Sequence, residues 1–122
     1  METNKGHVIL LVDDEQDILE FLSYTLQKEG YKVFTATNGE EAVKKVQEIS
    51  PSLILMDVMM PQMDGIEACQ IIRKDLNLKQ PIIAFLTARA EDYAQIAGFS
   101  AGADDYINKP IRPRLLISKI QS

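Results

Sequence analysis

Five short apolar runs divide the chain, and segments with apolar residues at helical spacing separate them. The runs cover residues 7–12, 31–36, 53–56, 81–86 and 105–108. Short apolar runs indicate strands, whereas apolar positions three and four residues apart indicate helices. Strands and helices therefore alternate along the chain, which predicts an α/β fold with a parallel sheet.

The helices are predicted from apolar stripes and from residues that favour helix ends. A first helix over about residues 15–29 ends at Gly30, and a second opens with Asn38 and Glu41 as a capping box and stops before Pro51. The stripes are Leu19, Leu22 and Leu26; Ala42, Val43, Val46 and Ile49; Ile66, Cys69 and Ile72 after Asp64-Gly65; Tyr93, Ile96, Ala97 and Ala101; and Leu116 with Ile120.

Two middle runs, residues 53–56 and 81–86, are apolar at every position. Strands of this composition are buried on both faces, so we expect helices above and below the sheet. With right-handed crossovers, residues 1–122 then form one open α/β sandwich. Ligands of such sheets bind outside the carboxyl ends of the strands.

Composition narrows the possible functions. The chain has 122 residues, 46% hydrophobic and 25% charged, which fits one globular domain. No apolar run approaches the roughly 20 residues that span a bilayer, so we expect no membrane segment and a cytoplasmic location. Cys69 is the only cysteine, which excludes an internal disulfide, and its apolar neighbours favour a small core residue. The net charge of −5 argues against nucleic-acid binding by this segment.

Reactive side chains follow four of the five predicted strands. Asp13 and Asp14 follow the first strand, Asp57 the third, Thr87 the fourth and Lys109 the fifth. A parallel sheet gathers these groups at one edge. Three carboxylates a few ångströms apart repel one another by about 4 kcal/mol per pair at an effective dielectric of about 20, so a cation must accompany them. Hard oxygen ligands point to Mg²⁺, for which Mn²⁺ could substitute, with phosphate as its usual companion.

Each of these residues has a simpler interpretation when it is taken alone. Asp13 or Asp14 could cap the first helix, Thr87 could be a loop hydroxyl, and Lys109 a solvated charge. Asp64 is interpreted as the cap of the third helix. The complementary set at four strand ends favours a phosphoryl-binding site.

Four segments resemble the receiver domains of two-component response regulators, the CheY-like family. They are LLVDDE (10–15), LILMDVMMPQMDG (53–65), LTA (86–88) and GADDYINKP (102–110), in the family's order and spacing. The resemblance covers essentially the whole chain. It implies a (βα)₅ flavodoxin/CheY-like fold with five parallel strands in the order 2-1-3-4-5 and helices on both faces.

The resemblance also implies roles for individual residues. Asp57 would accept a phosphoryl group from a sensor histidine kinase. Mg²⁺ would be held by Asp14, Asp57 and the backbone carbonyl of Met59, with Asp13 acting through water. The phosphorylated carboxylate would be an acyl phosphate.

The remaining implied roles concern the switch that follows phosphorylation. Lys109 and Thr87 would bind the phosphoryl group, and Tyr106 would turn inward as Thr87 moves, which reshapes the face of the fourth helix, fifth strand and fifth helix. A cis peptide bond would join Lys109 to Pro110. Met59 and Arg89 would tune hydrolysis of the acyl phosphate.

The tail DDYINKPIRPRLLISKI is most similar to the OmpR/PhoB subfamily, whose receivers form homodimers and carry a DNA-binding domain. Asp105 and Lys119 fit one ion pair across such a dimer. Three positions depart from the subfamily pattern: Leu115 stands in place of Glu, Gln95 in place of a basic residue, and Ile111 in place of Phe. We expect the N-terminal receiver of a longer regulator, with a stand-alone CheY-like protein as the alternative.

Other classes of protein fit the residues less well. An aspartate-nucleophile phosphohydrolase would carry an Asp-x-Asp pattern after the first strand, whereas this chain has VDDEQD. A flavin or nucleotide carrier would have a glycine-rich loop there. A degenerate receiver that serves only as an interaction module would lack part of the set formed by the acceptor Asp57, the metal ligands, Thr87 and Lys109. We therefore expect a signalling module that is not an enzyme with a separate substrate.

Overall fold

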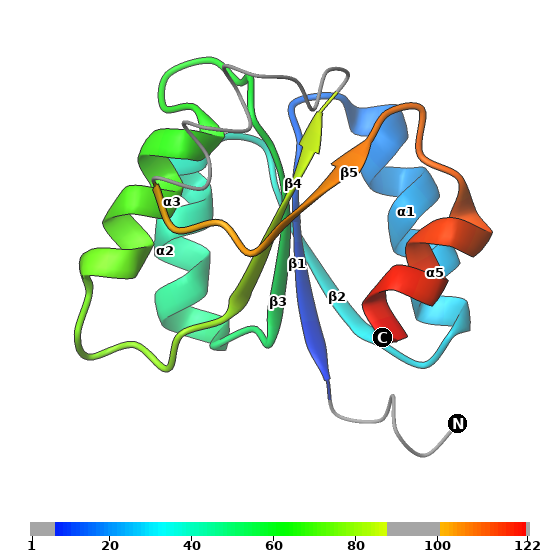
Figure 1. The fold of residues 1–122 in the computed structure, drawn as a ribbon, viewed down its shortest axis with the longest axis horizontal. Coiled ribbons are helices and arrows are strands. Elements are labelled where there is room, and N and C mark those ends of the chain that lie inside the picture. Colours follow the sequence, from blue (N-terminus) through cyan, green and yellow to red (C-terminus); the bar gives the residue numbers. More distant parts are fainter. Residues whose placement is uncertain (1–6, 88–100, 122) are drawn as a thin grey trace.

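The computed structural model describes residues 7–87 and 101–121. Its sheet has five parallel strands in the order β2-β1-β3-β4-β5, which confirms the predicted topology. The strands are β1 (Val8–Val12), β2 (Lys32–Ala36), β3 (Leu53–Asp57), β4 (Ile82–Thr87) and β5 (Asp105–Asn108). The carboxyl ends of all five therefore lie along one edge of the sheet (Figure 1).

Helices cover both faces of this sheet. The described residues include α1 (Gln16–Lys28), α2 (Gly39–Ile49), α3 (Gly65–Lys74) and α5 (Pro113–Gln121). Figure 1 shows α2 and α3 on one face and α1 and α5 on the other. Of the predicted fourth helix, Tyr93, Ile96 and Ala97 fall outside the described residues, whereas Ala101 is described and is buried in the core beside α2 and α3. None of the helices in the described part is long and apolar enough to cross a bilayer.

Side chains of the central strands alternate between two cores. Leu10, Ile54 and Phe85 face α2 and α3, whereas Leu11 and Leu55 face the core beneath α1 and α5, and all five are fully buried. Burying one such side chain contributes roughly 1.5–3 kcal/mol, so both cores hold the sheet in place. The prediction that β3 and β4 are covered on both faces is confirmed, because alternate residues of each strand lie in the two cores.

The ends of α2 and α3 follow the capping pattern of the sequence. The Asn38 side chain accepts a hydrogen bond from the Glu41 backbone N–H at 2.8 Å, and Asp64 caps α3 in the same way through Glu67 at 2.9 Å. The reciprocal bond of the expected capping box differs: the Glu41 carboxylate accepts from the backbone N–H of Thr37, at 2.6 Å, one residue before the cap. Glu41 therefore holds the end of β2 as well as α2.

The first helix begins differently from the expectation for its cap. Its cap residue is Glu15, which makes no capping hydrogen bond through its side chain. The Asp13 side chain instead accepts a hydrogen bond from the Glu15 backbone N–H at 2.9 Å. This bond precedes the helix, whose first residue is Gln16. At the other end, Gly30 takes a left-handed φ of 96° that an L side chain rarely adopts.

Candidate functional site

Three carboxylates meet at the carboxyl ends of β1 and β3. The register pairs Val12 with Met56, so the next residues, Asp13 and Asp57, lie side by side. One carboxylate oxygen from each of Asp13, Asp14 and Asp57 lies within 4.8 Å of the others. Asp13 is fully buried, Asp57 is 8% exposed and Asp14 is exposed at the mouth. The predicted cluster is therefore present and open to solvent on one side.

Lys109 supplies positive charge to this cluster. Its Nζ lies 3.0 Å from Asp13 Oδ2, 3.5 Å from Asp57 Oδ2 and 3.6 Å from Glu15 Oε1. Burial alone would lower the pKa of Lys109, but the hydrogen bond to Asp13 and the charges of Asp57, Asp13 and Glu15 raise it above its ordinary value. Glu15 was absent from the predicted set, although its place directly after two aspartates was a signal for it.

The environment of Asp57 disfavours its charge when no cation is bound. Burial contributes most and the carboxylate of Asp13 next, and with Asp14 they raise the pKa of Asp57 from 3.8 to about 6, while Lys109 opposes the change. The three carboxylates offer hard oxygen atoms in a compact group. A small divalent ion such as Mg²⁺ fits this donor set, because its charge offsets the repulsion.

The segment after Asp57 turns sharply into α3. The Gly65 backbone N–H donates to the Val58 carbonyl at 2.9 Å, and the Val58 N–H donates to Leu86 at 3.3 Å. A Cβ at Gly65 would collide with the Asp57 carbonyl oxygen. Glycine is therefore required for this close approach. Met59, two residues after Asp57, has 76% of its surface exposed.

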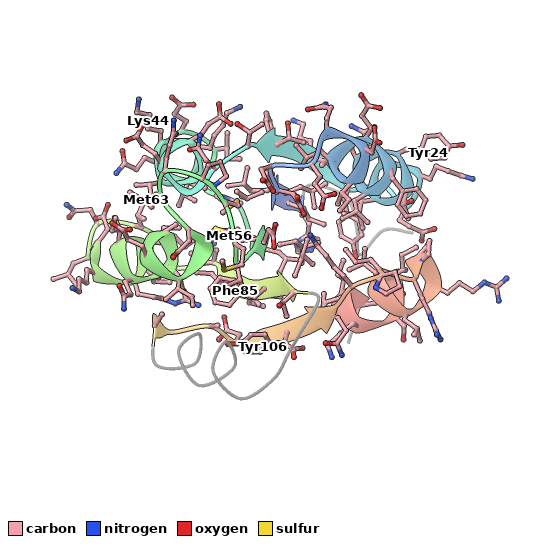
Figure 2. All side chains as sticks on the ribbon, turned by 90° about the horizontal axis from the view of Figure 1, so that it is seen from above. Tyr24, Lys44, Met56, Met63, Phe85 and Tyr106 are labelled. Carbon is pink, nitrogen blue, oxygen red and sulfur yellow. The ribbon has the colours of Figure 1, made fainter. Side chains whose placement is uncertain are left out.

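Thr87 and Tyr106 lie on neighbouring strands beside this cluster. Thr87 is the last residue of β4, and Asp57 is likewise the last residue of β3, whereas the sequence placed each just past its strand. The Thr87 side chain is buried. Its carbonyl accepts a hydrogen bond from the Lys109 backbone N–H at 2.8 Å. Tyr106 is also buried, and its ring centroid lies 5.8 Å from that of its cross-strand partner Phe85 (Figure 2). The peptide bond between Lys109 and Pro110 is cis.

Two of the predicted residues, Arg89 and the subfamily position Gln95, lie outside the described residues. Asp105 and Lys119 pair with each other inside one chain, at 3.5 Å, and each side chain is about half exposed. Leu115 on α5 is 61% exposed. The geometry of the single chain therefore leaves the predicted dimer face untested.

The described cluster combines the groups that phosphoryl transfer requires. A carboxylate at a strand end can attack phosphorus, and neighbouring acids can hold a divalent ion beside it. An ammonium group lies 3.5 Å from the carboxylate of Asp57, and a buried hydroxyl stands at the end of the neighbouring strand β4. Phosphoryl transfer depends mainly on positioning and charge neutralisation, both of which this arrangement supplies.

Comparison with known proteins places this arrangement in a family. Residues 9–121 match the family model of the response regulator receiver domain. The chain therefore belongs to the receiver domains of two-component signalling, as the motifs predicted. Proteins of this family are signalling proteins rather than classical enzymes. The assignment favours the receiver over the phosphohydrolase and the flavin or nucleotide carrier.

Individual relatives agree with this assignment. The chain is 45% identical over 114 residues to the alkaline phosphatase synthesis transcriptional regulatory protein PhoP of Bacillus subtilis (strain 168), an OmpR/PhoB-type regulator. That match covers 93% of this chain and 47% of PhoP, so the chain spans about half the length of this relative.

Solved structures show the same fold. Chemotaxis protein CheY4 of Vibrio cholerae matches with a TM-score of 0.89 at 35% identity, covering 94% of this chain and 96% of CheY4. A CheY-like receiver domain protein from Methanospirillum hungatei JF-1 matches with a TM-score of 0.87 at 33% identity, covering 94% and 90%. The CheY-like fold is therefore confirmed.

Proposed function

We propose that this chain accepts a phosphoryl group on Asp57 from a sensor histidine kinase in a Mg²⁺-dependent reaction. An ionised Asp57 oxygen forms the new bond to phosphorus while the bond from phosphorus to the donor nitrogen breaks. The observation that carries this proposal is the burial of Asp57 between Asp13, Asp14 and Lys109. This carboxylate pairs with Lys109 at 3.5 Å and lies at the ligand-binding edge of the sheet.

Four groups would hold the metal ion. Asp14, Asp57 and the Met59 carbonyl would bind Mg²⁺ or Mn²⁺ directly, and Asp13 would contact it through water. Both carboxylate oxygens of Asp13 already accept hydrogen bonds, from the Glu15 backbone and from Lys109, which supports an indirect contact. When bound, the ion neutralises charge on the transferring oxygens.

The same site would convert phosphorylation into a change of shape. Lys109 would leave Asp13 and contact the phosphoryl oxygens, and the Thr87 hydroxyl would donate to one of them. Tyr106 is buried against Phe85 in this structure, so an inward position of its ring is available without phosphorylation. Movement of Thr87 at the end of β4 would then reshape the face that includes β5 and α5. Met59 and Arg89 would set the rate of hydrolysis.

The reshaped face would control an output. The length of PhoP, about twice that matched here, supports residues 1–122 as the N-terminal receiver of a transcription regulator with a DNA-binding domain. The receivers would form a homodimer through the fourth helix of the family fold, β5 and α5. This dimer would couple phosphorylation of the receiver to DNA binding by the output domain. A stand-alone CheY-like module is the alternative, which the similarity to CheY4 favours. The length of the natural reading frame separates the two.

Intact mass spectrometry tests the phosphoryl acceptor. After incubation with Mg²⁺ and an acyl phosphate donor, we expect the wild-type chain to gain one phosphoryl group. We expect Asp57→Ala to gain none. Asp75→Asn, which alters an aspartate at the far end of α3 and keeps an acceptor for the Asn77 backbone, is the matched control and should be labelled like wild type. Equal labelling of Asp57→Ala and wild type would contradict the assignment.

A further inference from the structure

The loop between β3 and α3, residues 58–64, is attached to the molecule at two places. At its base, the backbone N–H of Gly65 donates to the Val58 carbonyl at 2.9 Å. Near its far end, the backbone N–H of Gly39, the first residue of α2, donates to the Met63 carbonyl at 2.9 Å. Met59 lies between these two attachments.

Gln62 adds a side-chain attachment beside the second of these. Its Oε1 accepts a hydrogen bond from the Asn38 side-chain nitrogen at 3.0 Å. The Asn38 side-chain oxygen simultaneously accepts from the Glu41 backbone N–H at 2.8 Å, where it caps α2. Both ends of the Asn38 carboxamide are used, so the cap of α2 orients the group that binds Gln62.

The backbone at Gln62 is itself unusual. Its φ of 69° lies in the left-handed region, which residues other than glycine, asparagine and aspartate rarely occupy. Such a conformation persists where the surroundings hold it in place. The bond to Asn38 supplies one such restraint, and close packing supplies another, because a Cβ at Gly39 would lie 2.5 Å from the Met63 carbonyl oxygen.

We propose that Gln62 is a positioning residue for the metal site. By tying the loop to the N-terminus of α2, it holds the Met59 carbonyl, three residues earlier, in the direction of Asp57. This inference rests on the proposed function, in which the Met59 carbonyl is a ligand of Mg²⁺. The Gln62 side chain binds Asn38 rather than a carboxylate of the site, so its effect would reach the metal ion through the loop backbone.

Calorimetric titration of the unphosphorylated protein with Mg²⁺ alone tests the proposal. We expect Gln62→Ala to raise the dissociation constant about tenfold, the lower end of the range for groups that orient metal ligands. Gln70→Ala, an exposed glutamine on α3, is the matched control and should bind like wild type. A dissociation constant for Gln62→Ala within about twofold of wild type would overturn the proposal.

A glycine variant separates the positioning role of the Gln62 side chain from its effect on the stability of the fold. Gln62→Gly also removes the bond to Asn38, but glycine adopts the left-handed backbone without strain. We therefore expect Gln62→Gly to unfold at a higher temperature than Gln62→Ala and yet to bind Mg²⁺ as weakly. If affinity instead returned to the wild-type value together with stability, the positioning role would be wrong.

A substitution of Asn38 tests whether Gln62 affects Mg²⁺ affinity through its hydrogen bond to Asn38. Asn38→Ser keeps a good helix cap but is too short to reach Gln62. Because both substitutions remove the same bond, the double variant Asn38→Ser/Gln62→Ala should bind Mg²⁺ no more weakly than either single variant, within about twofold. Additive losses would show that the two residues act separately and would overturn the proposal.

The wild-type titration distinguishes this inference from the proposed function. If wild type binds Mg²⁺ and Gln62→Ala binds it equally well, only the role of Gln62 is wrong. If wild type binds no Mg²⁺ at millimolar concentration, the proposed metal site fails and this inference fails with it.

Discussion

Asp57 shows how one residue couples the stability of the chain to its chemistry. The residue is 8% exposed, and the pKa of its carboxyl group, about 6, exceeds the ordinary 3.8 because of burial and the neighbouring carboxylate of Asp13. The folded chain therefore binds more protons than the unfolded chain between these two values. The contribution of Asp57 to the free energy of unfolding falls as pH rises from about 4 to about 6 and stays low above that.

We predict that Asp57→Asn stabilises the metal-free protein at about pH 7.5 by roughly 1–3 kcal/mol, because it removes the buried charge. Near pH 4 most of the difference from wild type should disappear, since Asp57 is then largely protonated in the folded state and about half protonated in the unfolded state. Added Mg²⁺ should stabilise wild type more than the variant. Urea unfolding at both pH values measures these effects.

The control for this measurement is Asp75→Asn, which lies away from the cluster and should follow wild type. A variant at Asp57 that is less stable than wild type at the higher pH would contradict the prediction. A stabilisation that persists unchanged near pH 4 would assign the effect to packing rather than to charge.

At the scale of elements, Arg73 joins three segments that the sequence does not connect. Its guanidinium donates to the carbonyls of Gly102 and Pro81, both at 2.8 Å, and to the side chains of Gln80 at 2.9 Å and Asp104 at 2.8 Å. It thereby ties the end of α3 to the beginning of β4 and to the segment before β5. This contact lies away from the carboxyl ends of the strands.

Arg73→Lys should destabilise the chain by about 1.5–3 kcal/mol, because an ammonium group cannot donate in these four directions at once. The rate of phosphorylation by an acyl phosphate donor should change little, since the groups that Arg73 binds in the described part of the chain lie away from the site. Urea unfolding and intact mass report the two quantities. Lys74→Arg, at the exposed neighbouring position, is the control. Equal stability of Arg73→Lys and wild type would contradict the stabilising role given to the Arg73 guanidinium.

The ends of elements show where sequence patterns were sufficient. Asn38 and Asp64 cap their helices as predicted, because capping depends on residues three positions apart. The predicted partner of the Glu41 carboxylate, the Asn38 backbone N–H, was wrong. The observed donor is the Thr37 backbone N–H, because the path of the chain from β2 into α2 decides which N–H the carboxylate reaches. Arg73 and Gln62 were missed for the same reason, since their partners are distant in sequence or set by the fold of a loop.

At the scale of the whole molecule, the proposed dimer makes the pairing of Asp105 and Lys119 testable. In one chain they form a half-exposed ion pair, which is worth little by itself. In a two-fold dimer each pair would occur twice across the interface, so that reversing one charge would create two repulsive contacts.

We therefore predict that phosphorylated wild type forms a dimer, whereas Lys119→Glu stays monomeric at the same concentration. The doubly reversed variant Asp105→Lys/Lys119→Glu should dimerise again. Size-exclusion chromatography with light scattering measures the mass. Lys44→Glu, on the outer side of α2 (Figure 2), is the control and should behave as wild type. Dimerisation of Lys119→Glu equal to wild type would exclude this pair from the interface.

The alternation of apolar runs and helical stripes was enough to determine the class of fold. It also determined which residues lie at the ends of the strands, so that Asp13, Asp57, Thr87 and Lys109 could be grouped before any coordinates. These features are local in sequence, because burial on one or two faces leaves a periodic pattern. The four motifs extended this local information to the family.

Tertiary structure decided what depends on distances between separate segments. It alone placed Lys109 closer to Asp13 than to Asp57, brought Glu15 to the same ammonium group, and tied Gln62 to Asn38. Side-chain length, direction and backbone conformation set these contacts, and none of them leaves a period in the sequence. The sequence thus determined which groups share an edge of the sheet, and the fold determined which of them touch.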